Sequence, residues 1–268
     1  MDFQLIHIEE TDSTNRWLRN YMALDKHGLA RTSSVRESPS SSDAIIAVAD
    51  YQTAGKGCGN NSWESERGKN LTFSVLLHPT EIRASWQFRI SEAVSVALCE
   101  TLERYFRPLS PSDSSHESGE QEVTIKWPND IYVGDRKICG ILIENRLQGP
   151  VIKDSIIGIG LNVNQRQFLS DAPNPVSLYQ LTGQETDREA LLKDFLEAFE
   201  RISPSETTSR DYRERLYRKG QEAIYEDQRG RFKARLTDVL PDGRLVLRDE
   251  TNRERAYAFK EVKFVVEN

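Results

Sequence analysis

The segment at residues 122–144 constrains the fold most strongly, because it places two apolar runs on either side of a proline-containing bend. Three β-forming residues lead to Lys126, and the tetrapeptide WPND at 127–130 then interrupts the run. Its proline cannot donate to a strand ladder, so pairing should be disturbed directly beside Lys126. After the pattern resumes, Gly134 predicts a hairpin turn before a second apolar run at 138–143.

Lys126 ends a strand that has the composition of a buried one, yet lysine is among the residues least often fully buried without a partner. One interpretation is a surface lysine beside a bend. The other is a cation directed into a cleft, where it would meet an anion. The segment alone leaves both open.

The same segment resembles the central signature of biotin–protein ligases. The matching residues are Lys126, Trp127, Pro128, Asn129 and Asp130, followed by Lys137, Gly140, Ile141, Leu142 and Glu144. In that family the lysine contacts both biotin and the nucleotide phosphate. The resemblance therefore implies that Lys126 is catalytic and binds both substrates, that Gly140 contacts biotin and that Asn129 contacts the adenylate.

The N-terminal segment predicts a strand at 3–8 and then a helix that begins near residues 12–15. Capping residues precede an apolar periodicity there, so Ser13 or Thr14 could simply cap the helix. A helix N-terminus also offers N–H groups and partial positive charge to a ligand. The motif DSTN resembles the biotin-ligase element that hydrogen-bonds the ureido ring of biotin, which implies that Ser13, Thr14 and Asn15 bind biotin.

The glycine-rich segment at 51–66 predicts a loop rather than a helix or a packed strand. Such a loop could be a plain connection, or its backbone could approach a ligand closely. It resembles the family pattern QTxGRGxxGRxW. The resemblance implies contacts to biotin or the adenylate, and closure of the loop over the adenylate. The implied biotin contacts are Gln52, Gly55, Lys56, Gly57 and Cys58, and the implied adenylate contacts are Lys56 and Trp63.

This loop also departs from the family pattern. Lys56 replaces the first arginine, Asn61 replaces the second, and Asn60 takes the place of a glycine. Lysine keeps the charge but not the bidentate fork of arginine, whereas asparagine tolerates the positive φ that glycine allows. These departures bear on how tightly the adenylate is held, not on the reaction class. Apart from the implied biotin contact, Cys58 is interpreted as an incidental thiol.

Further along the chain, strands are predicted at 44–50 and 70–77, and amphipathic helices at 86–105, 187–202 and 209–218. The polar segments 32–43 and 109–121 are predicted to be surface insertions without function. The buried strand at 155–164 contains Gly158 and Gly160, which suggest close approach by a backbone or a ligand. Its motif GIGLNVN resembles a third biotin-ligase element and implies that Asn162 lies beside the adenylate.

After Gly220 the pattern changes to short alternating strands, with a Pro-Asp-Gly turn at 241–243. We therefore predict an α+β protein with two domains. Residues 1–218 would form a mixed β-sheet flanked by helices, as in the class II synthetase-like catalytic fold of biotin ligases. Residues 219–268 would form a small C-terminal SH3-like β-barrel. No N-terminal helix-turn-helix pattern suggests a DNA-binding repressor.

Composition indicates which partners and which cellular compartment to expect. A formal net charge of −6 and a pI near 5.4 argue against nucleic acid as the main partner. No apolar run approaches the roughly 20 residues that a membrane-spanning helix needs, and the N-terminus lacks a signal-peptide pattern. The three cysteines are scattered, which suits a reducing compartment, so we expect the cytoplasm. No spacing of histidines and cysteines predicts a metal site.

The resemblance implies a two-step reaction in which biotin and ATP give biotinyl-5′-AMP and pyrophosphate, after which a lysine of a biotin carboxyl carrier protein takes the biotin. Mg²⁺ would arrive with ATP and be held largely by phosphates, and a homodimer is left open. One alternative is a related cofactor ligase or acyltransferase that attaches lipoate or octanoate to a carrier lysine. An octanoyl transferase would need a nucleophilic cysteine, for which Cys139 is the candidate near Lys126. Another is a non-catalytic biotin-binding module, which would need neither Lys126 nor the loop at 55–63.

Overall fold

The computed structural model describes residues 2–25, 44–59, 61–106, 122–170 and 174–265. The chain divides into two compact units, each built from two stretches of sequence. Unit 1 comprises Met1–Ala84 and Asp135–Glu200, and unit 2 comprises Ser85–Gly134 and Arg201–Asn268. The insertions predicted at 32–43 and 109–121, and Asn60 of the glycine-rich loop, lie outside the described residues.

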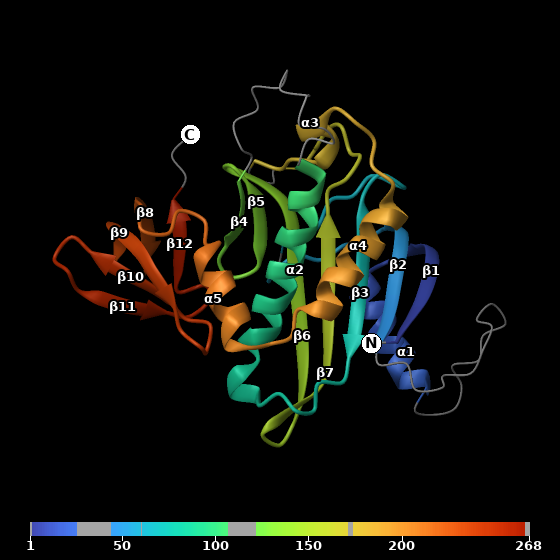
Figure 1. Ribbon diagram of the computed structural model, residues 1–268, viewed down its shortest axis with the longest axis horizontal. Coiled ribbons are helices and arrows are strands. Elements are labelled where there is room, and N and C mark those ends of the chain that lie inside the picture. Colours follow the sequence, from blue (N-terminus) through green and yellow to red (C-terminus); the bar gives the residue numbers. More distant parts are fainter. Residues whose placement is uncertain (1, 26–43, 60, 107–121, 171–173, 266–268) are drawn as a thin grey trace. The chain divides into compact units, whose positions relative to one another are not determined.

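A mixed β-sheet forms the centre of unit 1 (Figure 1). In spatial order its strands are β1 (Phe3–Thr11), β2 (Ala44–Gln52), β3 (Leu71–Leu77), β7 (Val151–Leu161) and β6 (Arg136–Gln148). The first two strands pair in parallel, whereas the remaining pairs are antiparallel. The mixed sheet predicted from the sequence is therefore confirmed.

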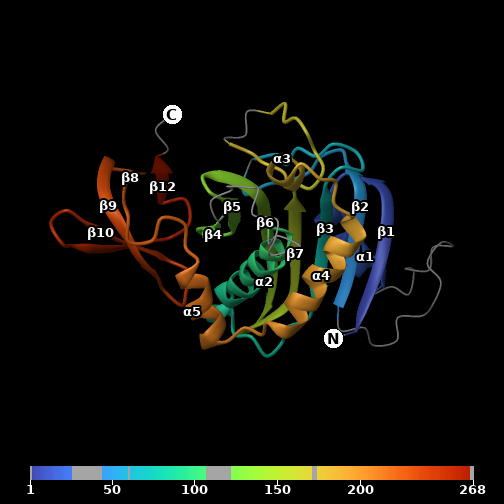
Figure 2. The same ribbon diagram turned by 45° about the horizontal axis from the view of Figure 1, so that its top comes forward.

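Helices cover both faces of this sheet (Figures 1 and 2). Helix α1 (Thr14–Asp25) contacts β2, β3 and β7, and α4 (Arg188–Arg201) lies on the other face, where Phe195 meets the ring of Phe73 edge to face. Successive side chains of a strand point to opposite faces. Phe73 therefore faces α4, while Ser74 and Leu76 face α1. A core cluster on the α1 side contains Leu18, Ala47, Leu76 and Ile156.

Helix α3 (Leu178–Thr182) was not predicted from the sequence. Ser177 and Gln180 form a capping box at its start, and Gly183 ends it in the left-handed conformation. With five residues it is shorter than two turns, so no apolar periodicity could reveal it.

Unit 2 combines a hairpin with two helices. Strands β4 (Val123–Lys126) and β5 (Asp130–Val133) pair antiparallel, with Lys126 opposite Asp130. The ladder thus stops at the lysine, as the proline predicts. Helix α2 (Phe88–Phe106) contacts this hairpin and α5 (Glu206–Glu214).

One detail of the α2 prediction is wrong. Trp86 belongs to the short 3₁₀ helix η1 (Ala84–Trp86) rather than to the buried stripe of α2. Its side chain is 44% exposed and lies against the guanidinium of Arg89. Tryptophan combines an apolar body with a polar tip, so its place in an apolar periodicity does not establish burial.

The C-terminal strands form an antiparallel sheet that is compatible with the predicted SH3-like barrel. In spatial order they are β11 (Glu254–Tyr257), β10 (Leu245–Asp249), β9 (Gly230–Val239), β8 (Glu222–Asp227) and β12 (Val262–Val265). The signature residue Trp127 donates its indole N–H to the carbonyl oxygen of Gly243 at 2.9 Å and packs against Phe259. Trp127 therefore has a structural role within unit 2.

Among the helices of the described residues, none is both long enough and apolar enough for a membrane crossing.

A carboxyl group is buried between the helices of unit 2. Glu92 on α2 is only 2% exposed and accepts a hydrogen bond from the hydroxyl of Ser209 on α5. Loss of hydration raises the pKa of Glu92, and this effect outweighs the hydrogen bond from Ser209 and the attraction of Arg213 and Arg89.

We expect Glu92→Gln to reduce the pH dependence of stability. The carboxyl of Glu92 has a higher pKa in the folded state than in the unfolded state. Its contribution to the free energy of unfolding is therefore fully present below the unfolded-state pKa and is lost as pH rises through the folded-state pKa. The uncharged amide can still accept from Ser209 and removes this loss. Denaturant midpoints at about pH 5 and about pH 8 should differ less in the variant than in the wild type. Glu214→Gln, at an exposed position of α5, is the control, and an unchanged pH difference in Glu92→Gln would contradict this account.

Candidate functional site

The N-terminus of α1 carries three predicted ligand residues, and all three are buried. Ser13, Thr14 and Asn15 are 4%, 3% and 5% exposed. The backbone N–H of Thr14, one of the donors that a helix start leaves without an intrahelical partner, donates to Oε1 of Gln52 at 2.8 Å. Gln52 ends β2, so the helix is capped from a neighbouring strand. The structure thereby brings Gln52 together with the DSTN motif.

Ser74 connects these residues and was missed in the sequence. Its Oγ lies 2.6 Å from Oγ1 of Thr14 and 2.6 Å from Oδ1 of Asn15, and its side chain is fully buried. On its other side, the Asn15 amide nitrogen donates to Oε2 of Glu144 at 2.9 Å. A hydroxyl inside the apolar run of β3 was the available signal, because a buried polar group needs a partner.

The glycine-rich loop is held by its own backbone. Gly57 donates to the carbonyl oxygen of Asn61 at 2.8 Å, and Trp63 donates to that of Gly55 at 2.9 Å. A Cβ at Gly55 would lie 2.7 Å from the carbonyl oxygen of Trp63, so only glycine fits there. Lys56 is exposed in this loop, and Cys58 is half-buried.

The indole of Trp63 lies against the glycines of β6 and β7. A Cβ built at Gly160 would be 2.4 Å from the ring, and one at Gly140 would be 3.0 Å from it. Gly158 is approached in the same way by the amide of Asn15, at 2.4 Å. Gly158 and Gly160 are closely approached, as predicted, but by side chains rather than by a backbone or a ligand.

Asn162 follows β7 and is almost completely buried. Its amide nitrogen donates to the carbonyl oxygen of Val176 at 3.1 Å, and its backbone N–H donates to that of Ile138 at 2.9 Å. The side-chain oxygen is buried and has no hydrogen-bond partner among the described residues. This oxygen is suited to accept from a ligand or to coordinate a hard cation.

In unit 2, Lys126 is half-buried beside aromatic rings. Its ammonium donates to the hydroxyl of Tyr132 at 2.9 Å and lies 4.7 Å from the centroid of that ring. The ring of Phe264 on β12 is 5.5 Å away, also within the range of a cation–π interaction. The ammonium is therefore held against aromatic rings, while the side chain stays partly exposed beside the bend. Asn129 lies in the turn between β4 and β5 and is partly buried. The catalytic role of Lys126 and the nucleotide contact of Asn129 stay predictions.

The family model described as the biotin/lipoate A/B protein ligase family matches residues 29–162, which is half of the chain. The chain therefore belongs to this family.

Curated relatives agree with that assignment. The chain is 31% identical over 164 residues to the bifunctional ligase/repressor BirA of Bacillus subtilis, covering 59% of this chain and 46% of the relative. It is 30% identical over 198 residues to BirA of Escherichia coli, with coverages of 70% and 52%. It is 29% identical over 182 residues to the biotin–[acetyl-CoA-carboxylase] ligase of Paracoccus denitrificans, with coverages of 65% and 70%. The chain thus spans about half the length of the two BirA proteins.

Solved structures share the fold. A biotin protein ligase from Aquifex aeolicus in complex with biotin and ATP superposes with a TM-score of 0.71 at 23% identity, covering 98% of this chain and 99% of that one. A biotin protein ligase from Leishmania major in complex with biotinyl-5-AMP gives a TM-score of 0.60 at 18% identity, with coverages of 96% and 98%.

We expect Gly160→Ala to release Trp63 from the sheet. The added methyl group would overlap the indole, so the ring and the loop that carries it must move. Cleavage after the exposed Lys56 by a lysine-specific protease should become at least about fivefold faster, because proteolysis follows local opening. Ser155→Ala, another buried position on β7, serves as control. An unchanged cleavage rate in Gly160→Ala would show that Trp63 does not hold the loop.

Proposed function

We propose that this protein activates biotin with ATP to form biotinyl-5′-AMP and then transfers the biotin to a lysine of a biotin carboxyl carrier protein or domain. The observation that carries the proposal is the buried polar cluster at the start of α1. It consists of Thr14, Asn15, Gln52 and Ser74, and three of these four match the family elements for the ureido ring.

The chemistry of this cluster supports a cyclic urea as ligand. The ureido ring of biotin presents one carbonyl acceptor and two N–H donors in a fixed plane. Gln52 uses its amide oxygen to accept from the backbone of Thr14, which leaves its amide nitrogen to donate. The hydroxyls of Ser13 and Thr14 can accept. Because these groups are buried, a ligand without matching polar groups would leave them unsatisfied, and that is costly.

The first step of the reaction brings the carboxylate of biotin toward the α-phosphate of ATP, so two anions must meet. A fixed cation about 4 Å from an anionic group contributes on the order of 4 kcal/mol at an effective dielectric constant near 20, or about a thousandfold in rate. We propose Lys126 for this role. In the second step it stabilises negative charge on the departing AMP phosphate.

The adenylate contacts that we propose are Lys56, Trp63, Asn129 and Asn162, together with Lys126. We further propose that Gly55, Gly57, Cys58 and Gly140 lie against biotin and that the loop closes over the adenylate. Closure would exclude water from an intermediate that water can hydrolyse. The buried ring nitrogen of Trp63 and the place of its indole against Gly140 support a loop that docks on the sheet.

We propose that Mg²⁺ enters with ATP. This ion prefers oxygen ligands and commonly binds through substrate phosphates with few protein groups. No cluster of three His, Cys, Asp or Glu side chains suited to a metal occurs in the described parts of the chain. The buried side-chain oxygen of Asn162 fits as a single oxygen ligand.

The proposed setting is the cytoplasm, with residues 1–218 as the catalytic domain and 219–268 as the SH3-like domain. Cys58, Cys99 and Cys139 form no disulfide, which suits a reducing compartment. The partner is the carrier protein of a biotin-dependent carboxylase, and a homodimer is left open.

Cys139, the nucleophile that the transferase alternative would use, is not accessible. Cys139 lies within β6, is fully buried and pairs opposite Leu161. A catalytic cysteine must reach the substrate as a thiolate, and reactive cysteines are partly exposed in electropositive surroundings. Cys99 is also fully buried, and burial raises the pKa of its thiol to about 12. These observations favour adenylation over acyl transfer through Cys139 or Cys99.

We expect release of pyrophosphate from ATP that depends on biotin, measured with purified protein by a coupled phosphate assay. Lipoate and octanoate at the same concentration should give at most about one hundredth of that rate, because neither carries the ureido ring that the buried cluster matches. Release with lipoate but not with biotin would assign the protein to the lipoate branch. Biotin binding without pyrophosphate release would indicate a non-catalytic module.

We also expect Lys126→Ala to slow adenylate formation by at least about a hundredfold, because the charge between the two anions is lost. Circular dichroism should confirm that the variant is folded. Lys233→Ala, which removes an exposed lysine from β9 in the same unit, is the matched control. A loss of less than about tenfold in Lys126→Ala would remove this residue from the centre of the mechanism.

A further inference from the structure

The two shortest hydrogen bonds around Ser74 favour one arrangement of protons. A hydroxyl has a single proton, and the Oγ of Ser74 lies 2.6 Å from two other oxygens. Oδ1 of Asn15 can only accept, so the proton of Ser74 must point to it. The contact to Thr14 is as short, and two oxygens at that distance require a proton between them. The hydroxyl of Thr14 also lies 3.2 Å from Oε1 of Gln52, but the two contacts of 2.6 Å need both hydroxyl protons, so Thr14 donates to Ser74 in preference to Gln52.

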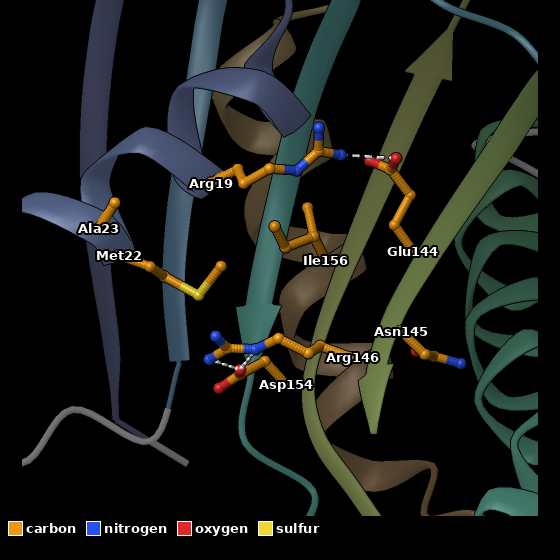
Figure 3. A pocket seen from close by; sticks show the side chains of 8 residues that line it. All are labelled: Arg19, Met22, Ala23, Glu144, Asn145, Arg146, Asp154 and Ile156. Carbon is orange, nitrogen blue, oxygen red and sulfur yellow. Dashed lines mark hydrogen bonds and ion pairs between the residues drawn. The ribbon is translucent and has the colours of Figure 1, made fainter. Parts of the chain in front are cut away.

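Glu144 fixes the Asn15 amide in the orientation that this arrangement needs. Its Oε2 accepts from the Asn15 amide nitrogen at 2.9 Å, and the carbonyl oxygen of Leu142 lies 3.4 Å from the same nitrogen. A flipped amide would turn its oxygen toward these acceptors. The other carboxylate oxygen accepts from Arg19 at 2.6 Å (Figure 3).

The ion pair itself contributes little to stability. The side chains of Arg19 and Glu144 are 52% and 39% exposed, and exposed ion pairs in general have small effects. Figure 3 shows Arg19 reaching from α1 across to Glu144 on β6. The pair therefore matters because it holds one carboxylate in place beside Asn15.

We propose that Ser74 and Glu144 are positioning residues that set the hydrogen-bonding polarity of the ligand site. Through Asn15, Glu144 orients the proton of Ser74, and Ser74 takes the proton of Thr14. The hydroxyl of Thr14 then presents only lone pairs to a ligand. The site therefore selects a ligand that offers an N–H group to Thr14. The assignment of that N–H group to the ureido ring of biotin rests on the proposed function.

Loss of either residue should weaken this selection in a specific way. Without the Ser74 hydroxyl, the proton of Thr14 keeps only the longer contact to Gln52 at 3.2 Å and can turn toward the ligand instead. The variant site would then bind a ligand that carries an oxygen atom at the position where the wild-type site requires an N–H group. A change that only disturbed packing would weaken both kinds of ligand equally and leave their ratio unchanged.

The experiment measures binding of biotin and of its two cyclic carbamate analogues, in each of which oxygen replaces one ureido N–H. Calorimetry on the full chain gives the ratio of dissociation constants between analogue and biotin. Wild type should reject one carbamate by at least about a hundredfold, because a buried acceptor facing oxygen is left unsatisfied. In Ser74→Ala this ratio of dissociation constants should fall at least about fivefold. In steady-state kinetics, the KM for biotin should rise about tenfold in the same variant, while the KM for ATP should change less than about twofold.

Ser155→Ala is the matched control, because Ser155 is a fully buried serine on β7 of the same sheet and its hydroxyl has no hydrogen-bond partner among the described residues. It should leave the ratio unchanged. Glu144→Gln provides a second variant that keeps nearly the same shape. Its amide can turn an N–H toward Asn15 and allow that amide to flip, so the ratio should fall in the same direction as in Ser74→Ala.

The outcomes separate the two proposals. If wild type does not bind biotin, the proposed function fails. If wild type binds biotin but both variants keep the wild-type ratio of carbamate to biotin, only the positioning roles of Ser74 and Glu144 are overturned.

Discussion

A chain of buried and partly buried hydrogen bonds at the start of α1 is the constraint on which the proposed ligand site depends. It runs from Gln52 through Thr14 and Ser74 to Asn15 and Glu144, and so ties the helix to β2, β3 and β6. Buried polar atoms are costly unless each has a partner, so this chain permits few alternative arrangements. The same atoms that stabilise the helix start thereby hold the ligand-binding groups in fixed directions before a ligand arrives.

Close packing on two glycines of β7 adds a second constraint. Asn15 fills the space above Gly158, and the indole of Trp63 fills the space above Gly160. One strand thus supports both the helix start and the glycine-rich loop. A methyl group at either glycine would overlap the side chain packed on it. The positions of the glycine-rich loop and of the polar cluster therefore both depend on the glycines of β7.

Much of the fold could be predicted because its elements have strong local patterns. The alternation of β1, the capping residues before α1 and the short strands after Gly220 each point to their element without tertiary information. Family signatures supplied the candidate ligand residues around Thr14 and Gln52. What the sequence did not reveal depends on contacts between distant residues. The role of Ser74 arises from oxygens about sixty positions away, and Trp86 is exposed because the chain turns before α2 begins.

Biotin at the start of α1 is the central claim, and a crystal structure of the protein grown with biotin alone tests it most directly. We expect the ureido ring within hydrogen-bonding distance of Oγ1 of Thr14 and the side chain of Gln52, with one ring N–H directed at the Thr14 hydroxyl. Biotin bound elsewhere, with the polar cluster around Ser74 untouched, would contradict the account.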